Sequence, residues 1–330
     1  MSQAAREAPP VADCLALYRR MLLVRKAEER LARDFKAGLL PGPVHLYIGQ
    51  EATAVGVCSH LGDADWITST HRGHGHYLAK GGEVAPMFAE IYGRSTGICR
   101  GMGGSMHVAD FSRGILGANG IVGGGLALAA GAALSAQLDG QKNVAVAFFG
   151  DGAASQGVLS EALNLAALWH LPLIFVCENN SFSEFSPTAA VTAGAIVDRA
   201  KPFGVTAVEV DGNDVLAVWN VAHLAVERAR RGEGATLIEA RTYRLHGHVE
   251  GEAAFLRESY RAESEVEARR SGDPIPRFRE HLLAAHVSQE TQLAAIEGEV
   301  TSMVEEAADR SAEDPWPVPS DLDSLGLGTA

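Results

Sequence analysis

The sequence predicts an α/β protein whose core is a doubly wound parallel sheet with flanking helices. Apolar runs typical of buried parallel strands lie near 144–149, 172–177, 205–210 and 236–243. Segments with the length of helices lie between or beside them, near 154–169, 194–203 and 213–231. Strands that alternate with helices favour parallel pairing, because a parallel partner needs a long crossover connection.

Length and composition fit an enzyme packed through small side chains. The 330 residues are 47% hydrophobic and include 36 glycines. They could form one large domain or two smaller ones, and we predict a single domain over 1–330. The net charge of −13 argues against nucleic acid or an anionic membrane as a partner. Four scattered cysteines and the lack of a secretory signal predict a cytoplasmic protein with reduced thiols.

The segments around the sheet have weaker patterns. Residues 11–37 show helical apolar spacing, and residues 276–330 are predicted to form a helical and extended tail. Residues 38–125 are rich in Gly and His without long periodic stretches, which favours loops that line a site. Residues 121–138 carry no charge and approach the length of a membrane span. Their Gly and Ala content favours instead a buried helix that other helices can approach closely, either within the chain or at a subunit interface.

The strongest functional signal is a pair of short motifs, each placed after a predicted strand. Gly150-Asp151-Gly152 follows the first strand, and Asn179-Asn180 follows the next, with Asn179 28 positions after Asp151. In a parallel sheet both motifs lie at the same edge. There an Asp carboxylate and an Asn carboxamide can hold one octahedral Mg²⁺ while phosphate oxygens fill other positions. Each motif alone is a common turn or loop, but the combination favours a diphosphate–metal site.

Further motifs occur in a fixed order along the chain. They are 45–51 (HLYIGQE), 70–75 (THRGHG), 103–107 (GGSMH), 119–123 (NGIVG) and 242–248 (TYRLHGH). With the GDG and NN motifs, they make the chain resemble the alpha subunit of the thiamine diphosphate-dependent 2-oxo acid dehydrogenases. This family contains the first components of pyruvate, branched-chain and acetoin dehydrogenases. The resemblance covers about residues 12–310.

The resemblance implies a thiamine diphosphate-binding fold and a role for particular positions. Asp151, Asn180 and the backbone carbonyl of Phe182 would ligate Mg²⁺, although relatives usually have a tyrosine at the position of Phe182. Arg72 and Arg244 match arginines that contact the diphosphate, and a guanidinium fork suits phosphate oxygens. The remaining implied cofactor contacts are His71, Gly120, Val122, Gly152, Ala153 and His248.

Histidines are concentrated in these motifs. His45 and His248 match family histidines near the reactive carbon of the cofactor, where an imidazole can donate a proton to a developing oxyanion. A structural role, capping a loop, is the alternative for each. His71, His74 and His76 could instead be read as a zinc cluster. The glycines between them and the absence of a cysteine partner favour a flexible loop.

The resemblance also implies a reaction and two partners. The cofactor ylid attacks a carbonyl, a carbon–carbon bond breaks, and the acyl group passes to a lipoyl-bearing acyltransferase component. A beta subunit would complete the site in an α₂β₂ heterotetramer, since this chain is long enough for only one half of the site. No nucleic acid or membrane partner is expected.

The substrate is indicated only by a short stretch after His248, which reads VEGE like the GHxEGD of acetoin dehydrogenase alpha subunits. We therefore favour acetoin, with pyruvate or a branched-chain 2-oxo acid as the alternative. A nicotinamide-dependent dehydrogenase is disfavoured because Gly150-Asp151-Gly152 lacks the third glycine of GxGxxG. A catalytically silent scaffold subunit is disfavoured because Asp151 and Asn180 are both present.

Overall fold

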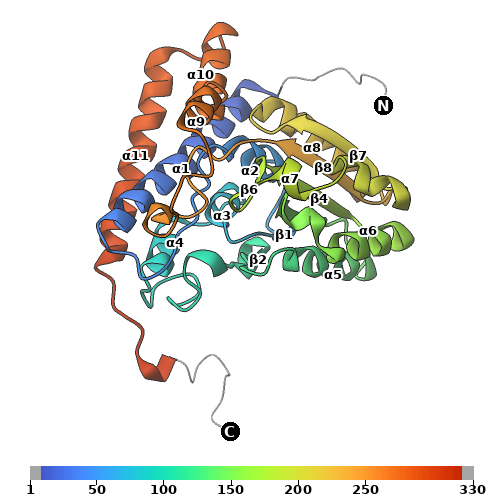
Figure 1. Ribbon diagram of the computed structural model, residues 1–330, viewed down its shortest axis with the longest axis horizontal. Helices are drawn as coiled ribbons and strands as arrows, with labels where there is room; N and C mark the ends of the chain where they lie inside the picture. Colours follow the sequence, from blue (N-terminus) through green and yellow to red (C-terminus); the bar gives the residue numbers. More distant parts are fainter. Residues whose placement is uncertain (1–8, 322–330) are drawn as a thin grey trace.

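The computed structural model describes residues 9–321, in which a six-stranded sheet is covered by helices on both faces (Figure 1). The strands stand in the order β2-β1-β3-β4-β8-β7, and all pairs are parallel. Their bounds are β1 Trp66–Thr68, β2 Ile115–Gly117, β3 Ala145–Gly150, β4 Leu173–Asn179, β7 Thr206–Asp211 and β8 Thr236–Arg241. The predicted α/β class is confirmed. Positions 1–8 of the predicted domain and 322–330 of the predicted tail lie outside the described residues.

Alternate residues of the central strands enter two separate apolar layers. In β3, Val146 and Phe148 face one layer, and Ala147 and Phe149 face the other. The first layer is covered by α1 (Val11–Lys36), α2 (Glu51–Cys58) and α8 (Val215–Arg230), and the second by α5 (Gly124–Leu138) and α6 (Gly157–Trp169). Burial on both faces explains why these strands are continuous apolar runs in the sequence.

A further group of helices lies at one end of the molecule, where two of them pack on α1 and the third, α4, packs on α11 (Figure 1). It consists of α4 (Val84–Ile91), α10 (Pro274–Ala284) and α11 (Glu290–Ala312). The side chain of Asp273 accepts the Ile275 N–H at the start of α10, and Pro274 occupies the first turn, where no N–H is needed. Lys26 of α1 pairs with Glu297 of α11 at 2.9 Å.

The stretch 38–125 contains more regular structure than its sequence predicts. It includes α2, α3 (His74–Ala79), α4, β1 and β2. Every residue of α2 is buried, so no alternation of apolar and polar residues marks it as a helix. The strands β1 and β2 have three residues each, too few for a periodic pattern. The prediction of loops throughout this stretch was therefore wrong.

Other elements differ from the expected ones in detail. The predicted helix 194–203 is the 3₁₀ segment Val197–Phe203, which contains Pro202, and the turn Ala153–Ser155 separates α6 from β3. The helix expected to be buried, α5, is buried on one face only, since Leu128 and Leu138 are 56% and 77% exposed. Among residues 9–321, no helix combines the length and apolar character that a membrane span requires. The remaining short elements are β5 Phe182–Ser183, β6 Ser186–Pro187, α7 Thr188–Val191 and α9 Glu263–Arg270.

Candidate active site

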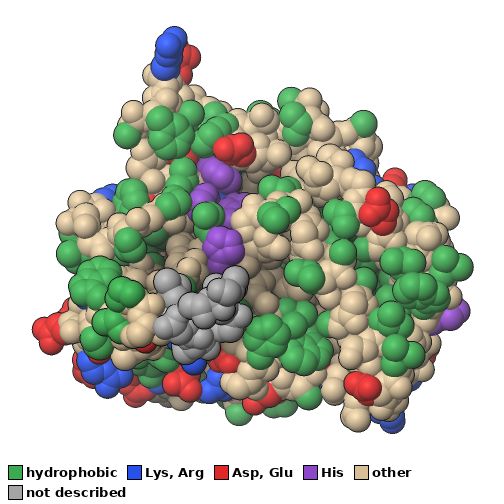
Figure 2. Space-filling view, turned by 90° about the horizontal axis from the view of Figure 1, so that it is seen from below, with side chains coloured by type: hydrophobic (Ala, Val, Ile, Leu, Met, Phe, Trp, Pro, Cys, Tyr) green, Lys and Arg blue, Asp and Glu red, His purple; other side chains and the backbone are tan. Residues whose placement is uncertain are grey.

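A cavity of about 320 Å³ lies at the carboxyl ends of the adjacent strands β1, β3, β4 and β8. This is the edge at which α/β sheets bind ligands. The cavity brings together all twelve predicted site residues, which are His45, His71, Arg72, Gly120, Val122, Asp151, Gly152, Ala153, Asn180, Phe182, Arg244 and His248. Figure 2 shows histidine side chains gathered in a hollow on one face of the molecule. The roles assigned to these residues remain predictions.

Asp151 and Asn180 follow two strands that pair directly. Asp151 is 2% exposed and accepts a hydrogen bond from the Thr188 hydroxyl. Burial raises the pKa of Asp151, and the Thr188 hydrogen bond opposes that effect. The Asn180 carboxamide accepts the Phe182 N–H at 3.2 Å and donates to Gln50 Oε1 at 3.0 Å. A buried carboxylate beside a carboxamide oxygen is a donor set that suits a hard divalent cation.

The loop that carries Phe182 doubles back in the short hairpin of β5 and β6. Ser181 and Glu184 adopt left-handed backbone conformations, with φ of 73° and 54°. Such conformations are costly for residues other than glycine and persist where surrounding contacts impose them. The hairpin also crowds Gly152, where an added Cβ would lie 2.4 Å from Ser183 Oγ. A larger residue after Asp151 would therefore displace the Ser183 side chain.

Arg72 and Arg244 are buried side by side without a carboxylate partner among residues 9–321. Arg72 donates to the carbonyl oxygens of Leu46 at 2.7 Å and His248 at 3.1 Å. Arg244 donates to the Glu184 carbonyl at 2.7 Å, and its Nε is buried without a hydrogen bond. Burial, followed by repulsion from Arg244, lowers the pKa of Arg72 to about 9, and burial also lowers that of Arg244. Two buried guanidinium groups without a carboxylate partner suit an anion with several oxygens, such as a diphosphate.

His45, His71 and His248 form a compact group, although they come from three separate segments. Their ring centroids lie 4.7 to 5.3 Å apart. Burial is the main cause, and Arg72 the second, of pKa values lowered to about 3 for His45 and about 2 for both His71 and His248. All three are therefore neutral at pH 7. The Nδ1 of His45 is buried without a hydrogen bond, so it is available to a ligand.

The alternative zinc cluster is not formed, because His74 and His76 point away from His71. His74 lies between Glu28 and Ser105, with contacts of 3.3 and 3.0 Å. His76 lies 3.1 Å from Glu178 and 2.7 Å from Ser69. Both are completely buried in α3, so the expected flexible loop was also wrong.

Two residues that line the cavity and one that holds the backbone behind it were missed by the sequence interpretation. Gln50 contacts Asn180, and Glu178 accepts a hydrogen bond from the buried Tyr47 hydroxyl. Arg261 donates to the carbonyls of Arg244 and His246, both at 2.6 Å, and so fixes the segment that carries the site. Gln50 lies within the motif 45–51, and Glu178 directly precedes Asn179-Asn180. These positions were the only indication in the sequence that the two residues belong to the site. Arg261 had none. The list of motif residues alone does not say which side chain contacts which.

Comparison with models of protein families identifies the family of this chain. A model of the dehydrogenase E1 component family matches residues 19–320. The chain belongs to this family. Its members are thiamine diphosphate-dependent oxidoreductases, as the ordered motifs predicted.

Relatives resemble the chain over nearly its whole length. It is 49% identical over 310 residues to the alpha subunit of acetoin:2,6-dichlorophenolindophenol oxidoreductase of Bacillus subtilis, covering 93% of this chain and 91% of the relative. The alpha subunit of the same name from Cupriavidus necator is 46% identical over 93% of this chain and 92% of the relative. The pyruvate dehydrogenase E1 component subunit alpha of Rhizobium meliloti is 40% identical, with 94% and 88% covered.

Proposed function

We propose that this chain is the alpha subunit of an acetoin dehydrogenase that uses thiamine diphosphate and Mg²⁺. The observation that carries the choice of substrate is the similarity to two acetoin oxidoreductase subunits, at 49% and 46% identity, against 40% for a pyruvate dehydrogenase subunit. The stretch 249–252, VEGE, supports the same choice. The alternative is a pyruvate or branched-chain 2-oxo acid dehydrogenase alpha subunit.

Two parts of the cavity would bind different components, one the metal ion and the other the diphosphate of the cofactor. Asp151, Asn180 and the Phe182 carbonyl would hold Mg²⁺, and Arg72 and Arg244 would hold the diphosphate. The oxygen donors suit a divalent cation, and the two guanidinium groups have no carboxylate partner among residues 9–321, so both sets fit these roles. When bound, the cofactor supplies the electron sink for carbon–carbon cleavage.

The histidines would handle the proton on the substrate oxygen. His248 Nδ1 lies 2.7 Å from Arg244 NH1, which can only donate, so Nδ1 accepts and Nε2 carries the hydrogen of the neutral ring. That N–H is left to donate to an oxygen that gains charge during bond cleavage. His45, 5.1 Å away between ring centroids, would provide a second polar contact for the same oxygen.

Partners are required because the cavity is open on one side. Ile121 and Val122, at its rim, are 73% and 52% exposed. A beta subunit that covers them would complete the site in an α₂β₂ heterotetramer, and a lipoyl-bearing acyltransferase component would accept the acyl group. We place this assembly in the cytoplasm.

Co-expression with a candidate beta subunit tests the proposal. The purified complex, supplied with thiamine diphosphate and Mg²⁺, is assayed for reduction of 2,6-dichlorophenolindophenol with acetoin, pyruvate and a branched-chain 2-oxo acid. We expect the highest kcat/KM with acetoin. A higher kcat/KM with pyruvate or the branched-chain acid would replace acetoin by that substrate, and no turnover with any of them would refute the proposed activity.

A further inference from the structure

Gln50 has no role assigned by the motifs, yet its side chain contacts a proposed metal ligand. It is the residue that precedes α2, it is 1% exposed, and it lines the cavity. Its Oε1 lies 3.0 Å from Asn180 Nδ2, across a separation of 130 positions in the sequence. The contact joins the segment before α2 to the end of β4.

The orientation of both amides follows from a backbone group. The Phe182 N–H can only donate, and it lies 3.2 Å from the Asn180 side chain, so the Asn180 atom facing it is Oδ1. Nδ2 must then face Gln50, and Gln50 must present its oxygen. Rotation of the Asn180 carboxamide by half a turn would place nitrogen against the N–H and lose both hydrogen bonds. The Phe182 N–H and the Gln50 oxygen therefore together hold the Asn180 carboxamide in one orientation.

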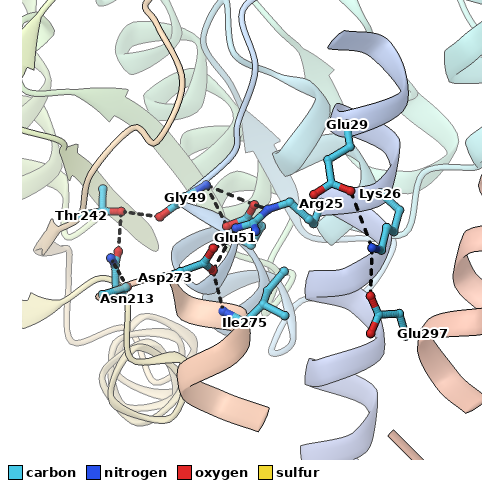
Figure 3. A network of polar contacts seen from close by, with 11 residues as sticks. Arg25, Lys26, Glu29, Gly49, Glu51, Asn213, Thr242, Asp273, Ile275 and Glu297 are labelled. Carbon is cyan, nitrogen blue, oxygen red and sulfur yellow. Dashed lines mark hydrogen bonds and ion pairs between the residues drawn. The ribbon is translucent and has the colours of Figure 1, made fainter. Parts of the chain in front are cut away.

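The backbone that carries Gln50 is held from both sides, as Figure 3 shows for the adjoining residues. The Glu51 carboxylate accepts the Gly49 N–H at 3.0 Å and Arg25 Nε at 2.6 Å. The Gly49 carbonyl accepts the Thr242 hydroxyl at 3.2 Å. Gly49 has φ of 101°, and a Cβ there would lie 2.4 Å from the carbonyl oxygen of Tyr243. Gln50 thus extends from a segment with little freedom to shift.

We propose that Gln50 is a positioning residue for the cation site, which holds the Asn180 carboxamide with its oxygen available to the metal. The proposal rests on the metal-ligand role of Asn180 in the proposed function, and it does not depend on the substrate. Removing the Gln50 oxygen takes away one of the two hydrogen bonds that hold this orientation and leaves only the Phe182 N–H. A larger part of the population then presents nitrogen, which cannot ligate Mg²⁺. The effect is on metal affinity first and on turnover only through it.

The test compares variants of Gln50 in the assembled, thiamine diphosphate-loaded protein, with Mn²⁺ affinity measured by electron paramagnetic resonance. Gln50→Met keeps the length of the side chain without its oxygen, and we expect about a 10- to 100-fold loss of Mn²⁺ affinity, the usual effect of losing a partner of a metal ligand. Gln50→Glu still accepts the Asn180 N–H, so it should bind Mn²⁺ at least as tightly as the wild type. Gln292→Met, on exposed α11, is the control and should change nothing.

Two outcomes overturn the proposal. One is wild-type Mn²⁺ affinity in Gln50→Met, and the other is an equal loss in Gln50→Met and Gln50→Glu. Thermal unfolding of each metal-free variant separates a positioning role from loss of the fold. The lost hydrogen bond lowers the midpoint of Gln50→Met, but the proposal predicts that each variant still unfolds in one cooperative transition well above the assay temperature. If Gln50→Met does not assemble, Gln50→Asn, which withdraws the acceptor by one methylene, serves in its place. None of these measurements uses acetoin, so a wrong substrate assignment leaves them intact.

Discussion

Replacement of Arg72 by methionine should stabilise the ligand-free protein while it weakens cofactor binding. Arg72 is 4% exposed and has no carboxylate partner among residues 9–321. A pKa lowered from the ordinary arginine value to about 9 corresponds to a cost on the order of 5 kcal/mol for carrying the charge at pH 7. Methionine removes this cost but leaves the buried Leu46 carbonyl without its donor, at about 1–3 kcal/mol. The other carbonyl belongs to His248, which is half-buried at the open cavity, where water can replace the donor. We expect a net gain of about 2–4 kcal/mol, in the direction found when hydrophobic residues replace buried ion pairs.

The assay is calorimetric unfolding with and without thiamine diphosphate and Mg²⁺. At a ligand concentration of about 100 times Kd, binding stabilises the wild type by about 2.7 kcal/mol. Loss of a charge-assisted contact to the diphosphate, worth about 1.5–3 kcal/mol, raises Kd by roughly 10- to 100-fold and removes most of that gain. Arg231→Met is a matched control, because Arg231 is exposed on the surface beside Glu233.

The two halves of this prediction are read separately. The Arg72 variant should unfold a few degrees higher than the wild type without ligand, and the two should converge or reverse when ligand is added. A variant that is less stable without ligand, and that keeps the full ligand-induced rise, would refute the view that Arg72 is a strained anion-binding group. The Arg231 control should differ little from the wild type in either condition.

Three further outcomes are expected. Asp151→Ala or Asn180→Ala should fold but lose Mg²⁺-dependent cofactor binding in a fluorescence titration; unchanged affinity would contradict the metal site. Burial lowers the pKa of His45 to about 3, so below pH 6.5 the unfolded chain gains a proton that the folded protein does not. The free energy of unfolding therefore decreases as the pH is lowered from 7 to 4. His45→Asn should make that fall shallower in unfolding midpoints measured from pH 7 to 4. Arg261→Met should expose residues 248–262 to limited proteolysis and lower activity, whereas equal protease resistance would argue against its anchoring role.

Much of the sheet could be predicted because each central strand is apolar on both faces. In β3, the residues of both layers are hydrophobic, so the strand is visible as one run. The edge strand β2 and its neighbour β1 were not predictable, since three residues acquire strand character only through pairing. The helix α2 was missed for a related reason, because burial on all sides leaves no periodic pattern to detect.

The site was predictable where chemistry and chain position coincide. Asp151 and Asn180 follow adjacent parallel strands, so sequence order alone places them together. Gln50 reaches Asn180 across 130 positions, and no local pattern records such a contact. His74 and His76 could ligate a metal by their chemistry. The helix α3 buries both side chains in the core, where His74 contacts Glu28 and His76 contacts Glu178.

Three charged groups of the cavity, Asp151, Arg72 and Arg244, share one property, which is that each is costly in the ligand-free state. Asp151 is a carboxylate whose ionised form is disfavoured by burial, and Arg72 and Arg244 are cations disfavoured by burial and, for Arg72, by mutual repulsion. In the proposed function, a Mg²⁺ ion would relieve the first cost, and a diphosphate would relieve the second. Since metal and diphosphate also bind each other, each raises the affinity of the protein for the other by the same factor. Cooperative binding would therefore come from the contact between metal and diphosphate, and the site should hold each component less tightly alone than in the presence of the other.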